Sequence, residues 1–592
     1  MRTPTLQYLY LQKPVTMVII ICIISVLPWI GLGDFSTKGE PREASVAVSM
    51  LETGNWVLPQ AYANEFAYKP PMAHWLMAAF SYPQGYVSEF TSRLPSTIAF
   101  IILMGCTLVF FGRRIKFQQA FIATLLLLTC IEIHRAAMTT RVDMLLTTFI
   151  VLGLYQLFNW EDKLELKGLP IIVPILLGCA VLTKGPVGII LPLFVFGVYL
   201  LMLRKYSYLT IFKALLYMGI SSLFLPMLWY IAAWKQGGNG FLNVVLAENF
   251  GRFFHINSPD INYDLGHENG VWYNFVTLAA GFIPWTIFFF FSIFGLKWQR
   301  KEHSFKEILK DTWNRILSME KEKLFSLVAL VCILFFYSIP SSKRSVYLMP
   351  AYPFIAIFLA QYALYITEYR TKVTRIFAAF LASVTAVVLI AIGLTMVGVI
   401  NPVAIASQYT DRLSTLAKVE AVSNMFSYSC GLTDCIVLVV LAALLTVLYQ
   451  MFKKINIKIL YATIALTFTI NLLIDGVIMR GIRQNGSARP FAEQVMKEYP
   501  LMNENNMFVM NNLKEYRNLY GLNFYLGNRF HNFEQEMPDG GFLFATKDDM
   551  EKIIKNFEGQ YTFSILTSSG RIIEEVGQPI ILSCFVHDDY NE

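Results

Sequence analysis

The sequence predicts an α-helical polytopic membrane protein, with about 13 transmembrane helices, outer interfacial helices and a C-terminal soluble α/β domain. Three observations support this fold class. Of the 592 residues, 55% are hydrophobic and only 15% are charged, whereas soluble proteins have roughly 25% charged residues. Apolar runs long enough to cross a hydrocarbon core of about 30 Å recur as far as residue 476. The tail after residue 480 is polar, with short apolar runs between turn residues.

The apolar runs lie in residues 1–480, which we predict to form the transmembrane domain, and residues 481–592 form the predicted tail domain. The first run, 16–30, resembles a signal-peptide core, but no small-residue cleavage site of the usual form follows it. We therefore interpret it as the first span. The other spans are expected near residues 95–112, 118–133, 142–159, 169–183, 187–203, 209–234, 271–296, 324–340, 346–368, 376–399, 431–452 and 457–476.

Lysine and arginine gather in alternate loops, and this pattern predicts the orientation of the chain. If the N-terminus is cytoplasmic, every cytoplasmic loop is basic, whereas the outer loops are short or mixed in sign. The net charge of +7 could also indicate a nucleic-acid partner, but the sequence has no basic stripe with interleaved aromatics. An odd number of spans places the C-terminus outside. The basic loops contain Arg113, Arg114, Lys116, Lys163, Lys167, Arg204, Lys205, Lys213, residues 297–323, Arg370, Lys372, Arg375, Lys453, Lys454 and Lys458.

The tail domain alternates short apolar runs with turn residues. The runs MFVMN, LNFYLG, GFLFAT and FSILT are predicted strands, and residues 490–497 and 547–557 are predicted helices. A small α/β domain on the outer face is therefore expected. The eight cysteines mostly lie inside apolar runs, without the spacing of a metal site or a disulfide framework. Only Cys430 and Cys435 are close enough along the chain for a disulfide to be worth testing.

The first outer loop, residues 33–95, is charged and aromatic in an otherwise apolar chain. Glu40 and Glu43 flank Arg42 at the start of a stretch with helical periodicity, which predicts a short helix in the membrane interface. The carboxylates are candidates for general-base chemistry. The alternative is that they are solvated acidic residues at a helix N-terminus. The apolar face of the predicted helix consists of Ala44, Ala47, Val48 and Leu51.

Cations recur later in this loop and in the other outer segments. Lys69 precedes two prolines that restrict its backbone, and Lys184 ends a short apolar run. Charged residues near a membrane are costly and are functional candidates by default, although a lysine there can also extend its ammonium to water. Asp143 begins the fourth span, where helix capping or pairing with Arg141 is the alternative role. Together the cations predict an anionic ligand at the outer interface. The remaining outer cations are Arg252, Lys343 and Arg344.

A series of short motifs resembles the integral-membrane glycosyltransferases that use polyprenyl-phosphate sugars. The most similar members are the aminoarabinose transferases that modify lipid A, and the protein O-mannosyltransferases are more distant. The resemblance covers at least residues 30–360 and includes the architecture of 13 spans with an outer domain. In chain order the motifs are GEPREA, MLETGNW, YKPP, SRLPS, VDMLLTTF, LTKGP, ENFGRF, GFIPW and SKRSVYLMPAYP.

The resemblance implies an inverting transfer, in which an acceptor oxygen attacks a sugar linked to undecaprenyl phosphate and the lipid phosphate leaves. It implies two catalytic carboxylates, Glu40 and Asp143, and a phosphate site formed by Lys69, Arg252 and Tyr347. Further candidates for the site are Arg42, Glu43, Lys184, Lys343 and His267.

The chain departs from the family pattern at three positions. Gly39 stands where an aspartate is common, so either Glu40 or Asp143 is the expected base, with Glu40 favoured. Tyr68 and Asn249 stand where a glutamate and a histidine bind a divalent ion in relatives. The matching His267 alone is a poor metal site. We therefore expect no tight metal site, although a divalent metal stays an open alternative, and the sequence has no other cofactor motif.

The resemblance implies a polyprenyl-phosphate-sugar donor, membrane lipid as a partner, and a location in a bacterial inner membrane with a periplasmic C-terminal domain. The acceptor is left open between a lipid A-like or other glycolipid, a surface glycan and a protein. The sugar is left open between a pentose and a hexose. Two other classes are weighed: a transporter, which would need internal repeats that the sequence does not show, and a noncatalytic scaffold or sensor. No nucleic-acid partner is expected.

Overall fold

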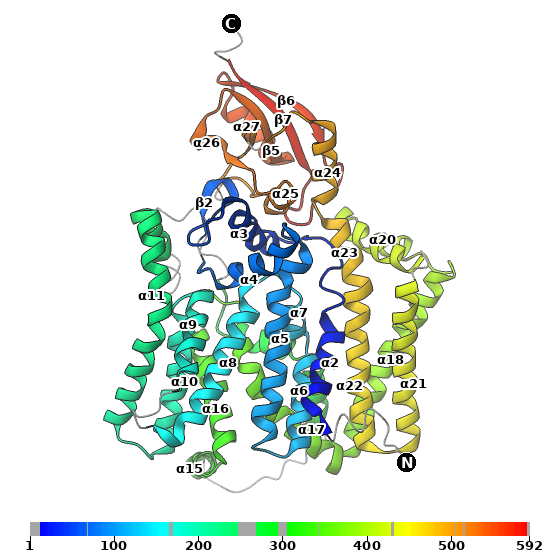
Figure 1. Cartoon of the computed structure of the whole chain (residues 1–592). Helices are drawn as coiled ribbons and strands as arrows, with labels where there is room; N and C mark the ends of the chain where they lie inside the picture. The colour runs from blue at the N-terminus through cyan, green and yellow to red at the C-terminus, as the bar shows by residue number, and fades with distance from the viewer. Residues whose placement is uncertain are drawn as a thin grey trace.

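The structure is a computed structural model of the whole chain, and it describes residues 12–67, 69–164, 170–246, 268–293, 305–340, 342–427, 431–503, 505–512 and 515–588. Most helices form a bundle, and the C-terminal residues form a separate domain at one end of it (Figure 1). Helices α3 (Gly39–Thr53) and α4 (Met72–Ser81) lie between the bundle and this domain. The helix expected in the first outer loop is therefore present.

The helices of the bundle follow the apolar runs of the sequence. They are α2 (Pro14–Val26), α5 (Glu89–Gly112), α6 (Phe117–Thr129), α7 (Ile131–Ala137), α8 (Val142–Trp160), α9 (Ile172–Lys184), α10 (Val187–Leu203), α11 (Tyr208–Leu246), α13 (Tyr273–Gly281), α14 (Trp285–Ile293), α16 (Lys321–Ser338), α17 (Tyr352–Tyr369), α18 (Thr371–Met396), α21 (Gly431–Lys453) and α22 (Asn456–Leu473). Shorter or peripheral helices are α15 (Phe305–Leu317), α19 (Pro402–Ala406), α20 (Leu413–Ser427) and α23 (Met479–Gly486).

Within the described residues, seven helices are long and apolar enough to cross a membrane, or up to nine if each of two bent pairs is one span. The expected count of about 13 spans is therefore too high by this measure. The α6–α7 and α13–α14 pairs are bent by 66° and 106°. Helices α2 and α9 have only 13 residues each, which corresponds to a rise of about 20 Å. The predicted outer position of the C-terminus thus depends on loop charge rather than on an odd number of spans.

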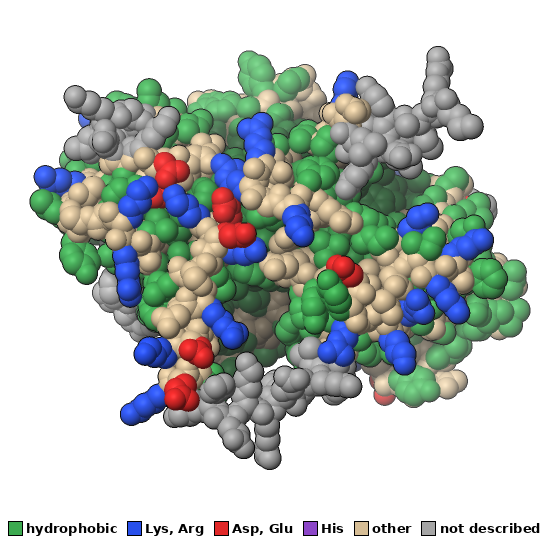
Figure 2. All heavy atoms as spheres, turned by 90° about the horizontal axis from the view of Figure 1, so that it is seen from below, with side chains coloured by type: hydrophobic (Ala, Val, Ile, Leu, Met, Phe, Trp, Pro, Cys, Tyr) green, Lys and Arg blue, Asp and Glu red, His purple; other side chains and the backbone are tan. Residues whose placement is uncertain are grey.

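The end of the bundle opposite the C-terminal domain is rich in basic side chains. Figure 2 shows this end from below, with Lys and Arg side chains spread across it and fewer Asp and Glu. The turn between α5 and α6 contains Arg113, Arg114 and Lys116, and the turn between α10 and α11 contains Arg204 and Lys205. These are the basic loops from which the sequence predicts a cytoplasmic position, because cytoplasmic loops are enriched in these residues.

The C-terminal domain contains a five-stranded mixed sheet in the order β4-β3-β5-β7-β6. Strand β3 pairs in parallel with β4 and β5, and β7 pairs antiparallel with β5 and β6. The expected helices at 490–497 and 547–557 are confirmed as α24 and α27. The elements are β3 (Met507–Val509), β4 (His531–Asn532), β5 (Gly540–Thr546), β6 (Tyr561–Ser568), β7 (Ile580–His587), α24 (Arg489–Glu498), α25 (Tyr520–Tyr525), α26 (Phe533–Glu536) and α27 (Lys547–Asn556).

One expected strand of this domain is wrong. The run LNFYLG forms most of α25, a helix that packs on α3, whereas the other three expected strands lie in β3, β5 and β6. The two alternatives have similar local signals, because a short apolar run fits a buried helix as well as a strand. Contacts with the membrane domain favour the helix: Phe524 packs against Phe35 with ring centres 4.9 Å apart.

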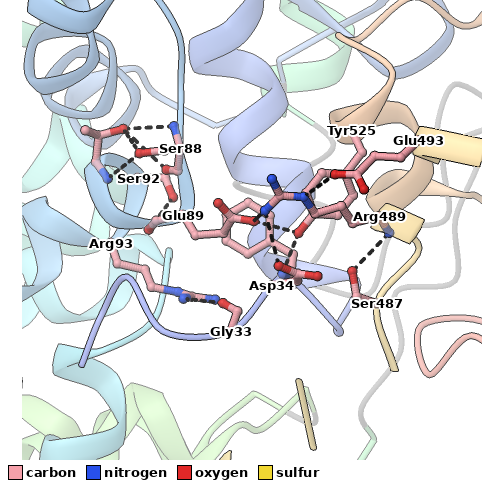
Figure 3. Close-up of polar contacts among 12 residues, drawn as sticks. Gly33, Asp34, Ser88, Glu89, Ser92, Arg93, Ser487, Arg489, Glu493 and Tyr525 are labelled. Carbon is pink, nitrogen blue, oxygen red and sulfur yellow. Dashed lines mark hydrogen bonds and ion pairs between the residues drawn. The ribbon is translucent and has the colours of Figure 1, made fainter. Parts of the chain in front are cut away.

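Polar contacts join α24 and α25 to the start of the first outer loop and to α5 (Figure 3). The Tyr525 hydroxyl donates to Glu89 over 2.8 Å and accepts from the Phe35 backbone N–H over 2.8 Å. Arg489 lies 3.4 Å from a carboxylate oxygen of Asp34 and 3.9 Å from one of Glu89. These contacts fix the C-terminal domain over α3.

Candidate functional site

Helix α3 carries the two carboxylates of the first outer loop. It begins at Gly39 and ends at Thr53, after which Gly54 has a φ of 68°, in the left-handed region that glycine favours. Glu40 and Glu43 lie near its N-terminus, and each residue is only 3% exposed. Carboxylates at this burial require compensating partners. The two side chains have different ones.

Glu40 is bound on both oxygens by Arg93 of α5. Arg93 Nε donates to Oε1 over 2.8 Å and Nη2 donates to Oε2 over 3.3 Å, while the Thr140 backbone N–H donates to Oε1 over 3.1 Å. Arg93 is fully buried and also donates to the carbonyl oxygens of Ile30 and Gly33. Burial would raise the pKa of Glu40, but the charge of Arg93 and these hydrogen bonds lower it to about 2. Glu40 is therefore a charged group that ties α3 to α5.

Glu43 has a lysine and a histidine as partners. Lys69 Nζ donates to Oε1, His74 Nε2 lies 3.0 Å from Oε2, and Arg42 Nη2 lies 3.5 Å from Oε1. Burial would raise the pKa of Glu43, but the charge of Lys69 and the hydrogen bond from His74 hold it well below its ordinary value. Burial also lowers the pKa of Lys69, an effect that Glu43 opposes.

The Glu43 cluster lines a small cavity of about 40 Å³ that lies under the C-terminal domain. Tyr520 of α25 forms part of its wall, and the Arg42 guanidinium lies 5.8 Å from the centre of the Tyr520 ring. Glu65 lines the same cavity and accepts a hydrogen bond from Asn511 Nδ2 over 2.8 Å. The C-terminal domain therefore helps to enclose the charged residues of the first outer loop.

A second carboxylate–lysine pair joins α8 and α9. Lys184, the last residue of α9, donates to Asp143 Oδ1 in the first turn of α8. Lys184 Nζ also lies 4.1 Å from the centre of the Tyr347 ring, in the 3₁₀ helix η5 (Ser345–Ala351). A cation over an aromatic face is attracted by the ring quadrupole. The structure thus brings together three residues that the sequence predicted separately.

The two pairs lie within electrostatic reach of each other. The charge of Asp143 acts on the pKa of Lys69, which it raises against the effect of burial. Arg141, at the N-terminus of α8, covers Gly39, because a Cβ added to Gly39 would lie only 2.8 Å from Arg141 Nη2. Carboxylates and cations therefore alternate across the end of the bundle that faces the C-terminal domain, which is a suitable arrangement for a ligand with a phosphate group.

The other residues predicted from the sequence either lie away from these two pairs or fall outside the residues that the structure describes. Lys343 is 4% exposed and donates to the Asn269 carbonyl oxygen over 3.1 Å, so it fastens residues 268–270 to its own segment. Arg252 and His267 lie outside the described residues. The same holds for Tyr68, Asn249 and Cys430.

Among the residues that the structure describes, no group of three or more His, Cys, Asp or Glu could hold a metal ion. Two residues of the site were missed from the sequence. His74 stands five residues after Lys69, and that proximity could have indicated it. Arg93 lies 53 residues from its partner Glu40, and nothing local connects them.

Part of the chain is similar to known proteins. Residues 68–230 match the family model described as dolichyl-phosphate-mannose-protein mannosyltransferase. An undecaprenyl phosphate-alpha-4-amino-4-deoxy-L-arabinose arabinosyl transferase of Enterobacter sp. (strain 638) is 24% identical over 329 residues, 55% of this chain and 54% of that protein. An uncharacterized protein of Aquifex aeolicus is 27% identical over 352 residues, 59% of this chain and 72% of that protein. The match thus spans about half the length of that arabinosyl transferase.

The fold is similar to a solved structure over nearly the whole chain. The crystal structure of ArnT from Cupriavidus metallidurans bound to undecaprenyl phosphate has a TM-score of 0.66 and 16% identity, covering 96% of this chain and 97% of that one. Its apo state also has a TM-score of 0.66. At this identity the likeness shows the fold. With the sequence matches, it confirms the resemblance that the motifs predicted.

Proposed function

Because the chain is a relative of the membrane glycosyltransferases that use lipid-phosphate sugars, we propose that it transfers a sugar from an undecaprenyl-phosphate-linked donor to an acceptor of the cell envelope. The observation that carries this proposal is the alternation of carboxylate and lysine at the outer end of the bundle. Lys69 pairs with Glu43, and Lys184 pairs with Asp143 beside Tyr347.

The proposed reaction needs cations for the leaving group and a base for the acceptor. The acceptor oxygen forms a bond to C1 of the sugar, the bond from C1 to the phosphate oxygen breaks, and the acceptor proton passes to a carboxylate. Attack opposite the phosphate inverts the configuration at C1. Lys69, Lys184 and the Tyr347 hydroxyl are suited to bind the phosphate as its negative charge grows. Arg252 joins them on the resemblance alone.

Of the two carboxylates expected from the resemblance, Asp143 is the one in contact with a lysine of this set. Glu40 also stays a prediction, but its oxygens are bound by Arg93 and by the Thr140 backbone.

For the sugar and the acceptor, we propose that the protein transfers an aminated pentose to a lipid A-like acceptor on the outer face of a bacterial inner membrane. It is supported by the similarity to arabinosyl transferases. The basic end of the bundle supports a cytoplasmic N-terminus and a periplasmic C-terminal domain. A protein acceptor is the second candidate, because the mannosyltransferase family model covers residues 68–230, which contain Lys69, Asp143 and Lys184.

The proposal is tested with purified protein and an undecaprenyl-phosphate-linked sugar, by measuring release of undecaprenyl phosphate. Mass spectrometry of envelope lipids, glycans and proteins from cells with and without the protein identifies the acceptor by one missing sugar mass. Lys69→Met should lower turnover by about 10²–10³-fold, the usual loss when one donor to a developing negative charge is removed.

Lys205→Met is the matched control. Lys205 lies in the turn that joins α10 and α11, at the basic end of the bundle. Its Nζ donates to Glu161 over 3.1 Å. Its replacement should leave turnover unchanged. A wild-type protein that consumes no lipid-phosphate sugar, or a fully active Lys69→Met variant, would contradict the proposed function.

A further inference from the structure

We propose that Glu43 is the general base for the acceptor hydroxyl, and that it becomes available when the donor phosphate takes its place on Lys69. This inference rests on the proposed function. It deepens that function by assigning the proton acceptor and the order of events at the same site.

Glu43 is more accessible than Glu40 to an incoming ligand. Glu40 and Glu43 are equally buried, but only Glu43 shares a cavity with the lysine and with a wall of the C-terminal domain. The partner of Glu40 is an arginine with no exposed surface, whereas the Lys69 side chain is 19% exposed. An incoming phosphate can therefore compete with Glu43 for Lys69 without disrupting the buried core.

Glu43 lies one helical turn after Gly39 on α3. Gly39 offers no side chain, and the Arg141 guanidinium occupies the space over it. Residues four apart lie on the same face of a helix, so Glu43 places a carboxylate one turn further along the face that Gly39 leaves bare. It is also the carboxylate of α3 that contacts Lys69.

The charge of the donor phosphate favours its contact with Lys69. A phosphate diester carries one negative charge and gains a second as its bond to C1 breaks, so its attraction for Lys69 increases along the reaction. Phosphate oxygens on Lys69 would neutralise the largest of the charges that depress the pKa of Glu43, while Arg42 and His74 continue to lower it. That pKa then rises toward the range in which a carboxylate accepts a proton efficiently.

His74 is the positioning residue of this arrangement. Lys69 binds Oε1 of Glu43, whereas His74 Nε2 donates to Oε2 over 3.0 Å. When Lys69 turns to the phosphate, His74 keeps the carboxylate in place and Oε1 loses its closest donor, while Arg42 Nη2 lies 3.5 Å away. In the proposed step the acceptor proton moves to Oε1 as the acceptor oxygen bonds to C1, and the C1–phosphate bond electrons remain on the lipid phosphate.

The experiment separates binding from turnover in the full-length protein. Glu43→Gln removes the base but keeps the shape of the side chain. We expect turnover of the sugar donor to fall by about 10²–10⁴-fold, while the affinity for undecaprenyl phosphate is unchanged or higher, because Lys69 no longer has a carboxylate competitor. A purely structural role for Glu43 would instead weaken binding together with turnover.

Two further variants complete the design. Glu52→Gln makes the same change on an exposed position of α3 and should behave as wild type. Glu43→Asp restores the charge and should recover part of the turnover. Wild-type turnover by Glu43→Gln, or loss of undecaprenyl phosphate binding in that variant, overturns this inference alone. A wild-type protein that binds undecaprenyl phosphate but consumes no sugar donor overturns the proposed function and the base role with it.

Discussion

The surroundings of Glu40 and Glu43 differ, although both lie on α3 three residues apart and both are 3% exposed. Glu40 meets a planar guanidinium that is fully buried and binds both of its oxygens. Glu43 meets a flexible lysine at the edge of a cavity and a histidine that holds its second oxygen. The pKa of both carboxylates is depressed.

Burial and a depressed pKa therefore do not separate a structural carboxylate from a reactive one. The partner cation makes the difference, because a buried arginine in a bidentate pair has no room for another anion. A partly exposed lysine can exchange one anion for another. The predictions below test this distinction, beginning with the largest expected effect.

Glu40→Ala should cause the largest loss of stability. It leaves the charge of Arg93 buried with only neutral partners, and removal of one member of a buried ion pair costs about 3–5 kcal/mol. Thermal unfolding of the detergent-solubilised protein measures the change. Glu43→Ala should cost less, because Lys69 is partly exposed and can be hydrated. Equal losses of stability in Glu40→Ala and Glu43→Ala would contradict the distinction between the two partner cations.

Lys184→Met should affect transfer more than stability. Lys184 resembles Lys69 in having a carboxylate partner and a side chain that is 23% exposed. If it also binds the leaving phosphate, its loss should lower kcat/KM by about 10²–10³-fold. The paired variant Asp143→Asn, alone and combined with Lys184→Met, shows by a double-mutant cycle whether the two act as a unit. A change in unfolding temperature without a change in kcat/KM would show that the Lys184–Asp143 pair has a structural role, as the Arg93–Glu40 pair does.

The helices could be predicted from the sequence because their signals are local. Apolar length and periodicity indicated the bundle, the helix at Gly39–Thr53 and helices α24 and α27. The bends of the α6–α7 and α13–α14 pairs and the shortness of α2 and α9 could not be predicted, because neither shows in hydropathy. Nor could the two-residue strand β4 or helix α25, whose structure depends on neighbours that are distant in the sequence.

The charged residues of the site could be predicted, but their pairing could not. Lys69 lies 26 residues from Glu43, and Lys184 lies 41 residues from Asp143. Glu40 and Glu43 look equivalent in the motif GEPREA, and only the fold shows that Arg93 reaches one of them. The resemblance favoured Glu40 because it stands beside the position of the missing aspartate, whereas the cavity favours Glu43.

Glu575 extends the comparison to a buried carboxylate that makes no ion pair within the described part of the chain, although the charge of Lys38 acts on its pKa. It is buried in the C-terminal domain and accepts a hydrogen bond from the Gly521 backbone N–H over 2.7 Å. Burial raises its pKa from 4.5 to about 7, which corresponds to about 3 kcal/mol. Because the folded state binds the proton more tightly, this stabilisation is complete below pH 4.5 and is lost as the pH rises to about 7.

The measurement for Glu575 is the unfolding temperature at several pH values. Wild-type protein should lose stability between pH 5 and 7 on account of this residue, and Glu575→Gln should flatten that part of the profile. Glu574→Gln is the control, because Glu574 makes a partly exposed pair with Lys418. An unchanged slope in Glu575→Gln would show that Glu575 is charged in the folded state.

Arg489→Ala should have the smallest effect, because the Arg489 side chain is 47% exposed. It contacts Asp34, Glu89 and Glu493 at the junction between the domains (Figure 3), but exposed ion pairs contribute only about 0–1 kcal/mol. Tyr525→Phe at the same junction should cost more, since the Tyr525 hydroxyl bonds both Glu89 and the Phe35 backbone. Unfolding of the two variants at low and at high salt measures both effects, and only the Arg489 contribution should decrease with salt. A loss for Arg489→Ala as large as that for Glu40→Ala would contradict the view that an enclosed partner, rather than the number of contacts, decides the cost.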